Sequence, residues 1–149
     1  MTQEDKELLL KDLCSRLPYG VKGHYKYYDI IGGRECLTDE NDGDITSIDI
    51  NLGNPIKING YYTEVEYVKP YLRPMSSMTE EEKEELSIIR SEDFQLVKQW
   101  VKSESIKETG TPCPVTCGEV DFCNKHHLDY RGLIPMGLAL EAPEGMYDK

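Results

Sequence analysis

The chain of 149 residues lacks a long apolar stretch, since its longest apolar run without a charged residue extends only from Leu133 to Leu140. A helix that spans a bilayer needs about 20 apolar residues, so no membrane segment is expected. The first residues also lack the basic start and the apolar run of a signal peptide, and we therefore expect a cytoplasmic protein. In that compartment cysteines stay reduced, and the odd number of five argues further against a closed set of disulfides.

Basic residues are too few to balance the acidic ones, because 17 Lys and Arg stand against 28 Asp and Glu, a net charge of −11. Affinity for phosphate comes from clustered Lys and Arg, so this excess of acid disfavours general binding to nucleic acid or to an anionic membrane. The acid is concentrated in two blocks, 39–44 and 80–85. We interpret both blocks as solvated faces. An acidic surface that mimics nucleic acid is the alternative.

No complete catalytic or nucleotide-binding motif occurs: the sequence has no Walker loop, G-x-G-x-x-G, G-x-S-x-G or H-E-x-x-H. We therefore expect a protein that is not an enzyme, carries no cofactor and binds an unidentified protein partner. The composition, 38% hydrophobic and 30% charged, is typical of a folded globular protein. A single domain over residues 1–149 would bury about 70% of its unfolded surface, enough for a stable core without disulfides or bound metal.

The residues that are present predict an α+β fold that begins with a helix. Thr2 is a candidate N-cap, and Leu9, Leu13 and Leu17 recur at the spacing of one helical face. Cys14 falls in the same stripe, so we expect it to be buried as a small hydrophobic residue. Pro18 and Gly20 then end the helix.

A β-rich part of about five short strands is expected over residues 21–68. The turn signals that separate these strands are Gly32-Gly33, Asp42-Gly43, Gly53-Asn54-Pro55 and Asn59-Gly60. Such a series predicts a small antiparallel meander or a partly closed barrel. The last strand is expected over Tyr61–Val68, and Pro70 should end the region.

A mostly helical part is expected over residues 77–149. Ser77 and Glu80 have the spacing of a capping box before a helix that reaches about Arg90, and a second helical stretch is expected from Ser91. A short helix is predicted for Glu119–His127. Leu138–Glu141 fits either a helix or a strand.

One segment concentrates metal-binding side chains, with the spacing C-x₃-C-x₅-C-x₂-H-H. Cys113, Cys117, Cys123 and His127 are four soft ligands of the kind that bind zinc tetrahedrally, and the last two share a helical face. No C-x₂-C pair follows the C-x₃-C spacing, however, and a chain of this length folds without metal. We therefore favour packing thiols with a solvent-facing histidine, and keep a small zinc-binding protein as the alternative.

The same segment contains the components of a cysteine nucleophile. Cys123 with His126 or His127, oriented by Asp121 or Asp129, would form a thiolate–imidazole pair. Residues of such pairs usually come from distant parts of the chain, so we do not favour this interpretation.

Tyrosine is concentrated in the β-rich part, with eight of ten between Tyr19 and Tyr71 and with Lys26 and Lys57 nearby. Aromatic rings beside cations on a small barrel are typical of surfaces that bind single-stranded nucleic acid. We favour packing instead, because tyrosine also fills small sheets and the surrounding acid would repel phosphate. A nucleic-acid-binding barrel remains an alternative.

Three segments carry a sequence resemblance to other proteins: LPYGVK (Leu17–Lys22), VKPYLRPMSSMTEEE (Val68–Glu82) and HHLDYRGLIPMGLALEAPEGMY (His126–Tyr147). They resemble a group of short uncharacterised proteins from Bacteroides-type gut bacteria and their phages or prophages. The resemblance implies an intracellular, phage-related protein, and it implies no activity and no catalytic residue. In these blocks Arg73 and Arg131 are cations among apolar residues, so each is predicted to bind a carboxylate or a helix-end carbonyl.

Overall fold

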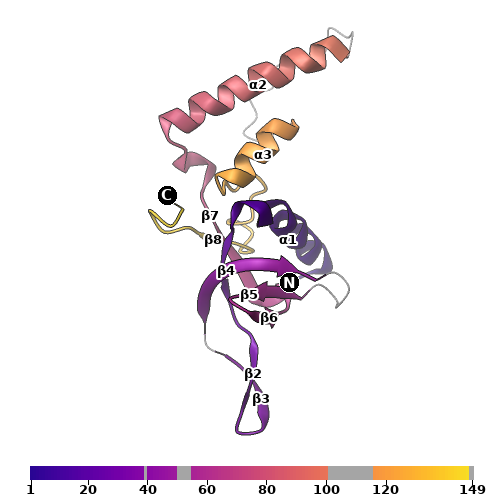
Figure 1. The fold of residues 1–149 in the computed structure, drawn as a ribbon, viewed down its shortest axis with the longest axis vertical. Helices are drawn as coiled ribbons and strands as arrows, with labels where there is room; N and C mark the ends of the chain where they lie inside the picture. The colour runs from indigo at the N-terminus through magenta and orange to yellow at the C-terminus, as the bar shows by residue number, and fades with distance from the viewer. Residues whose placement is uncertain (39, 50–54, 101–115, 148–149) are drawn as a thin grey trace. The chain divides into compact units, whose positions relative to one another are not determined.

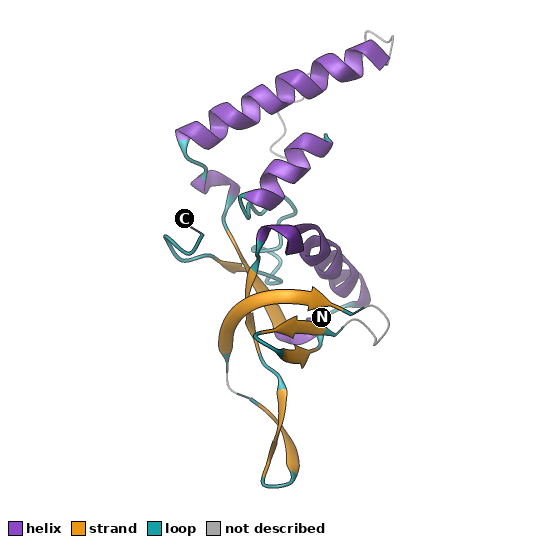
Figure 2. Cartoon of the chain, in the orientation of Figure 1, coloured by secondary structure: helices purple, strands orange, loops and turns teal. Residues whose placement is uncertain are grey.

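The computed structural model describes residues 1–38, 40–49, 55–100 and 116–147. They form two compact units, the sheet unit (Met1–Leu72 and Gly132–Lys149) and the helical unit (Arg73–Arg131). Helices and strands occur in the proportions of an α+β protein, which confirms the expected fold class (Figures 1 and 2). Within the described residues, no helix combines the length and the apolar composition needed to cross a bilayer.

Among its described residues, the sheet unit has one long helix, two 3₁₀ turns and eight strands. They are α1 (Gln3–Arg16), η1 (Leu17–Tyr19), β1 (Lys22–Tyr25), β2 (Tyr28–Ile31), β3 (Arg34–Leu37), β4 (Asn41–Ile48), β5 (Ile56–Ile58), β6 (Tyr61–Thr63), η3 (Val65–Tyr67), β7 (Val68–Leu72) and β8 (Leu140–Glu141). Six strands form one sheet in the order β6-β5-β4-β1-β7-β8, and β2 and β3 form a separate hairpin. All pairs are antiparallel except β7 with β8. The expected helical part therefore ends earlier than residue 149, because β8 belongs to the sheet.

Two of the predicted turns are confirmed. Gly32 and Gly33 both have positive φ angles, 61° and 80°, which a tight hairpin turn requires. Asn59 and Gly60 adopt the same kind of conformation, with φ angles of 48° and 88°. The Gly53-Asn54-Pro55 signal lies largely outside the described residues.

The turn predicted at Asp42-Gly43 is wrong, because both residues lie inside β4. Gly43 pairs with Gly23 of β1, and the Asn59 side chain lies close against it. A Cβ atom at Gly43 would come within 2.2 Å of the Asn59 amide, so the glycine permits close approach rather than a turn. Asn59 uses that space to donate to the Asp42 carbonyl and to accept from the Asp44 amide.

The predicted last strand, Tyr61–Val68, is also wrong in extent. The chain leaves the sheet after Thr63, makes the η3 turn and returns as β7. Pro70 lies within β7 and pairs with Gly23, so it does not end the strand region. Proline can occupy this position because its missing N–H removes a donor from only one side of the strand.

The core of the sheet unit lies between α1 and the inner face of the sheet. Its buried apolar residues are Leu9, Leu13, Val21, Tyr25, Ile45, Ile56, Ile58, Val65, Val68, Leu72, Leu133, Leu138 and Ala139. Each large aliphatic side chain contributes about 1.5–3 kcal/mol when it leaves water. The segment after Gly132 supplies three of these residues, and this burial attaches the C-terminal segment to the sheet unit.

The predicted leucine stripe packs in the core, with Leu9 and Leu13 buried and Leu17 half-buried against them, but the buried face of α1 also includes two charged residues. Leu9, Asp12, Leu13 and Arg16 are its buried residues, whereas Cys14 is exposed, so the expectation that this thiol is buried is wrong. Asp12 and Arg16 lie four residues apart and form a bidentate ion pair, with distances of 2.7 Å and 3.0 Å. Both side chains are fully buried. The buried face of α1 therefore includes two charged positions that the leucine spacing does not predict.

The helical unit contains α2 (Glu80–Trp100), α3 (Cys117–Lys125) and the short η4 turn (Met75–Ser77). The predicted capping box of α2 is wrong by two residues: Thr79 and Glu82, rather than Ser77 and Glu80, exchange the two capping hydrogen bonds. The helix also continues through Ser91 without a break. The predicted short helix near Glu119 is confirmed as α3. Leu86, Phe122, Cys123 and Leu128 form the small core of this unit.

The buried ion pair of α1 makes a prediction about stability. We expect Asp12→Ala to lower the free energy of unfolding by about 3–5 kcal/mol, because it leaves the Arg16 guanidinium buried without its carboxylate. Urea unfolding followed by circular dichroism measures the loss. Glu7→Ala, an exposed carboxylate on the same helix, is the matched control and should cost far less.

A double variant separates charge from packing. Asp12→Leu with Arg16→Met removes both charges and keeps the volume, so it should recover most of the stability lost by Asp12→Ala. Equal losses for Asp12→Ala and Glu7→Ala would contradict this account of the buried pair.

Candidate functional site

The predicted metal ligands are spread over α3 and its two flanks. Cys117 is the exposed first residue of the helix, and Cys123 is buried in the core of the helical unit. Six residues of an α-helix place these two cysteines about 120° apart around the axis. His127 is buried beyond the helix end, with a positive φ of 54°, and is not solvent-facing.

The zinc site stays a prediction, because Cys113 lies outside the described residues. Within the residues that are described, no three His, Cys, Asp or Glu side chains are grouped closely enough to hold a metal ion. Cys123 is only 1% exposed and packs with Leu86, Phe122 and Leu128. That position fits the packing interpretation of this thiol, since a nucleophilic cysteine needs access to its substrate.

His126 is part of an ion cluster at the start of α2. Its ring packs on Phe122 with centroids 4.4 Å apart, and its Nδ1 lies 3.0 Å from Glu82 Oε1. The Arg73 guanidinium binds the same carboxylate in a bidentate manner, at 2.7 Å and 2.8 Å. Arg73 also donates to the Ser77 carbonyl, which confirms the prediction for this residue. The Arg131 guanidinium lies over the Tyr130 ring, 4.7 Å from its centre, and the carboxylate or carbonyl partner expected for this residue stays a prediction.

The Arg73 guanidinium lowers the pKa of Glu82 to about 2, and the hydrogen bond from the Thr79 amide acts in the same direction. A carboxyl group with a depressed pKa stabilises the folded state above its unfolded pKa, near 4.5, and loses this effect as pH falls toward 2. Glu82 therefore stays ionised at ordinary pH. It ties Arg73, the cap of α2 and His126 together, which is a structural role.

This cluster predicts a change in titration. In Arg73→Gln, the pKa of Glu82 should rise from about 2 toward its usual range, because the adjacent positive charge and two charge-assisted hydrogen bonds are lost. Carboxyl ¹³C shifts recorded against pH measure it. The pKa of Glu66, lowered by Lys6 in the other unit, is the internal control and should not move. An unchanged Glu82 titration would contradict the assigned cause.

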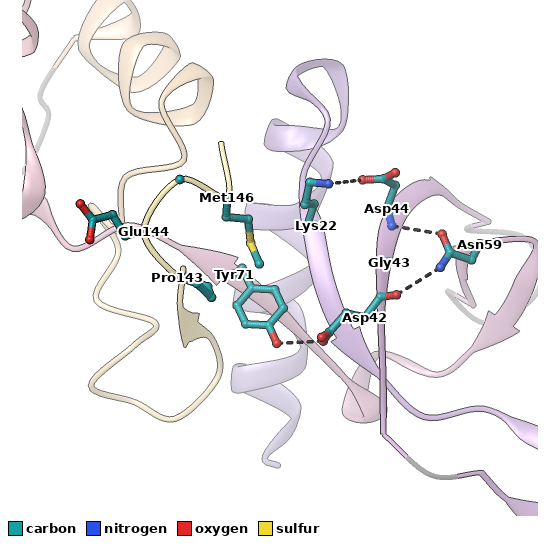
Figure 3. Close-up of a pocket in the computed structure, with 10 residues that line it drawn as sticks. Lys22, Asp42, Gly43, Asp44, Asn59, Tyr71, Pro143, Glu144 and Met146 are labelled. Carbon is teal, nitrogen blue, oxygen red and sulfur yellow. Dashed lines mark hydrogen bonds and ion pairs between the residues drawn. The ribbon is translucent and has the colours of Figure 1, made fainter. Parts of the chain in front are cut away.

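A pocket of about 550 Å³ lies on the sheet unit (Figure 3). Its lining comes from β1, β4, the β5–β6 turn, β7 and the C-terminal segment: Lys22, Asp42, Gly43, Asp44, Asn59, Tyr71, Pro143, Glu144, Gly145 and Met146. Lys22 Nζ lies 3.4 Å from Asp44 Oδ1. Strand pairing thus brings together residues that are more than 100 positions apart in the chain.

Tyr147 fixes the wall that the C-terminal segment contributes to the pocket. Its hydroxyl donates to the Tyr71 carbonyl at 2.8 Å and accepts from the Lys22 amide at 3.1 Å. Burial raises the pKa of Tyr147 to about 12, so the phenol keeps its proton. One side chain therefore satisfies backbone groups of both β1 and β7 beside the pocket.

Asp42 is the most constrained carboxylate of the pocket. Its Oδ1 lies 2.8 Å from His24 Nδ1 and accepts a hydrogen bond from the Tyr71 hydroxyl at 2.8 Å. The hydrogen bond from His24, followed by the one from Tyr71, lowers the pKa of Asp42. Burial, reinforced by Asp42, raises the pKa of Tyr71 to about 12. The pocket therefore holds an ionised carboxylate beside a protonated phenol.

The hairpin β2–β3 projects from the other strands of the sheet unit (Figures 1 and 2). Residues directly opposite one another share a face, so the pairs Tyr28–Leu37 and Ile30–Glu35 form one face. Tyr28, Ile30 and Leu37 are 53%, 71% and 40% exposed. We call these three side chains the apolar hairpin face.

The base of the hairpin is attached to the body by side chains. The hydroxyls of Tyr28 and Tyr67 lie 3.1 Å apart, and their rings meet edge to face. The hydrogen bond with Tyr28 raises the pKa of Tyr67 to about 12. Thr38 closes the hairpin against the Tyr27 backbone through two hydrogen bonds. The hairpin thus has a fixed root while its strands remain exposed.

The tyrosines are divided between packing and surface. Tyr25 is buried, and Tyr27 stacks on Tyr61 with ring centres 4.1 Å apart. Tyr62 is 54% exposed, with Lys57 Nζ 5.5 Å from its ring centre. Packing, the interpretation that we favoured, therefore explains part of the tyrosine concentration, and the nucleic-acid alternative stays untested.

Comparison of the chain with protein-family models, with curated proteins and with solved structures found no match. The candidate sites are therefore defined by geometry alone. Sequence reasoning missed the pocket because Asp42-Gly43 has the composition of a turn, and because no local signal connects residues 143–146 with β4. A signal for the hairpin face was present, namely the Gly32-Gly33 turn after Tyr28 and Ile30.

Proposed function

We propose that the protein is a non-enzymatic protein-binding module and that its binding element is the apolar hairpin face. The observation that carries this proposal is the exposure of Tyr28, Ile30 and Leu37 on one side of a projecting hairpin. The phage-related context is part of the proposal and rests on the sequence resemblance.

The marginal stability of an exposed hairpin favours a partner protein that covers it. An isolated two-stranded hairpin is at best marginally stable in water. Here all four β2 residues are exposed, so this strand receives little support from the core of the unit. A partner surface over Tyr28, Ile30 and Leu37 would remove apolar area from water, at about 25 cal/mol for each Å². Clustered exposed apolar side chains of this kind mark interaction sites.

Charge favours a different protein over a second copy as the partner. Two copies would each carry a net charge of −11 and repel one another. Glu35 lies beside Ile30, on the same side of the hairpin as the apolar hairpin face, whereas Arg34 pairs with Ile31 on the opposite side. The complementary partner therefore has an apolar groove with a basic rim.

Paired variants test this proposal. Ile30→Ser with Leu37→Ser should abolish capture of the specific partner from a host extract, because both substitutions remove apolar contact area. Ile31→Ser is the matched control, since Ile31 is 60% exposed on the other face and should leave capture intact. Neither change should shift the unfolding free energy by more than about 0.5 kcal/mol, because all three side chains are exposed.

The captured partner must then protect the hairpin. After purification it should slow amide hydrogen exchange in residues 28–37 of the wild-type protein and not in the Ile30→Ser, Leu37→Ser variant. A protein retained equally by all three forms would overturn the proposal. Self-association that depends on Ile30, or retention of nucleic acid alone, would overturn it as well.

A further inference from the structure

The pocket of the sheet unit has a chemistry unlike that of the apolar hairpin face. Three carboxylates, Asp42, Asp44 and Glu144, line it together with one ammonium group, that of Lys22. The Tyr71 ring and the Met146 thioether add apolar surface beside these charges. Its volume of about 550 Å³ lies within the range of small-molecule sites.

We propose that this pocket binds the terminal ammonium or guanidinium group of an alkyl chain. Asp42 and Asp44 supply acceptor oxygens from neighbouring outward positions of β4, and acid exceeds base among the lining residues. In such a complex the Tyr71 ring attracts the cationic end of the ligand, and the Met146 thioether packs against its alkyl chain. This inference is independent of the hairpin proposal.

The contacts of Asp42 indicate which of its carboxylate oxygens can bind a ligand. Among the described contacts, the Tyr71 hydroxyl and His24 both engage Oδ1, which leaves Oδ2 as the acceptor for a ligand. Figure 3 shows the Tyr71 hydroxyl directed at this carboxylate, while the Glu144 side chain points away from it. Glu144 therefore acts from the rim, and Asp42 makes the direct contact.

Other ligand classes fit the pocket less well. An anion would meet the Asp42 and Asp44 carboxylates and only one ammonium group, that of Lys22, which already lies 3.4 Å from Asp44 Oδ1. A hard divalent cation needs six or more oxygen ligands at short distance, and within the described part of the chain no three acidic, His or Cys side chains are grouped tightly enough to hold one. An organic cation needs only one or two carboxylates with an apolar wall, which is the arrangement present.

Two sources supply this chemistry, a free polyamine and a lysine or arginine side chain of another protein. The direct test uses n-butylammonium and n-butylguanidinium as probes, with n-butanol as the neutral control. In amide NMR titrations of the full chain, both cations should cause saturable shifts at Lys22, Asp42, Asp44, Tyr71 and residues 144–146. The alcohol should not.

Shape-preserving variants assign the binding to the pocket. Asp42→Asn should weaken binding of both probes about 2- to 5-fold, the range expected for one exposed ion pair. Glu144→Gln leaves the bonds to His24 and Tyr71 in place and should weaken binding less. Glu35→Gln removes the same charge from the hairpin, outside the pocket, and should leave binding unchanged.

The sources are then distinguished with spermidine and with blocked lysine and arginine amides. Spermidine binding at least tenfold more tightly than the amides indicates a polyamine, and the reverse order indicates a protein side chain. Shifts that rise linearly without saturation, or equal weakening by Asp42→Asn and Glu35→Gln, would overturn the proposal. The Ile30→Ser, Leu37→Ser variant should bind the probes normally, which separates this site from the hairpin.

Discussion

The sheet depends on strand β4, whose backbone serves two neighbours in succession. Residues 41–44 pair with β1, and residues 45–48 pair with β5, with a register shift between Ile45 and Ser47. Such an irregularity bends the strand and increases its twist, so the sheet changes direction within one element. Asn59 holds the junction by bonding the backbone on both sides of Gly43, a contact that only glycine permits. The pocket carboxylates Asp42 and Asp44 are displayed because this stretch is a strand.

The helical unit depends in a similar way on one carboxylate. Glu82 accepts from the Arg73 guanidinium, caps the Thr79 amide and lies beside His126. Hydrogen bonds to charged groups contribute about 1.5–3 kcal/mol each, more than neutral ones, so this group orders the start of α2. The backbone of Arg73 meanwhile pairs with the segment after α3, through His127 and Asp129. These backbone contacts hold the segment that begins at His126 within the helical unit.

The two proposed binding elements of the sheet unit obey opposite physical rules. The apolar hairpin face gains free energy by leaving water, and its specificity depends on shape and on the surrounding charge. The pocket offers ionised oxygens beside the Tyr71 ring and the Met146 thioether, so cation binding there is expected to weaken with added salt. Both proposed sites would bind a partner that carries positive charge, which agrees with the acid excess of the chain.

The sequence by itself determined the α+β class, the first helix, the Gly32-Gly33 and Asn59-Gly60 turns and the short helix near Glu119, because each depends on local spacing and backbone preference. Only the tertiary structure decided that Asp42-Gly43 is part of a strand, that Asp12 and Arg16 are buried, and that residues 132–147 return to the sheet. Local rules assign charged residues to the surface and Asp-Gly to turns. A partner far along the chain reverses both tendencies: Asn59 fits against Gly43, and the core formed with the sheet covers the Asp12–Arg16 pair. The pocket forms between strands and a C-terminal segment that are far apart in the chain, so no local sequence pattern predicts it.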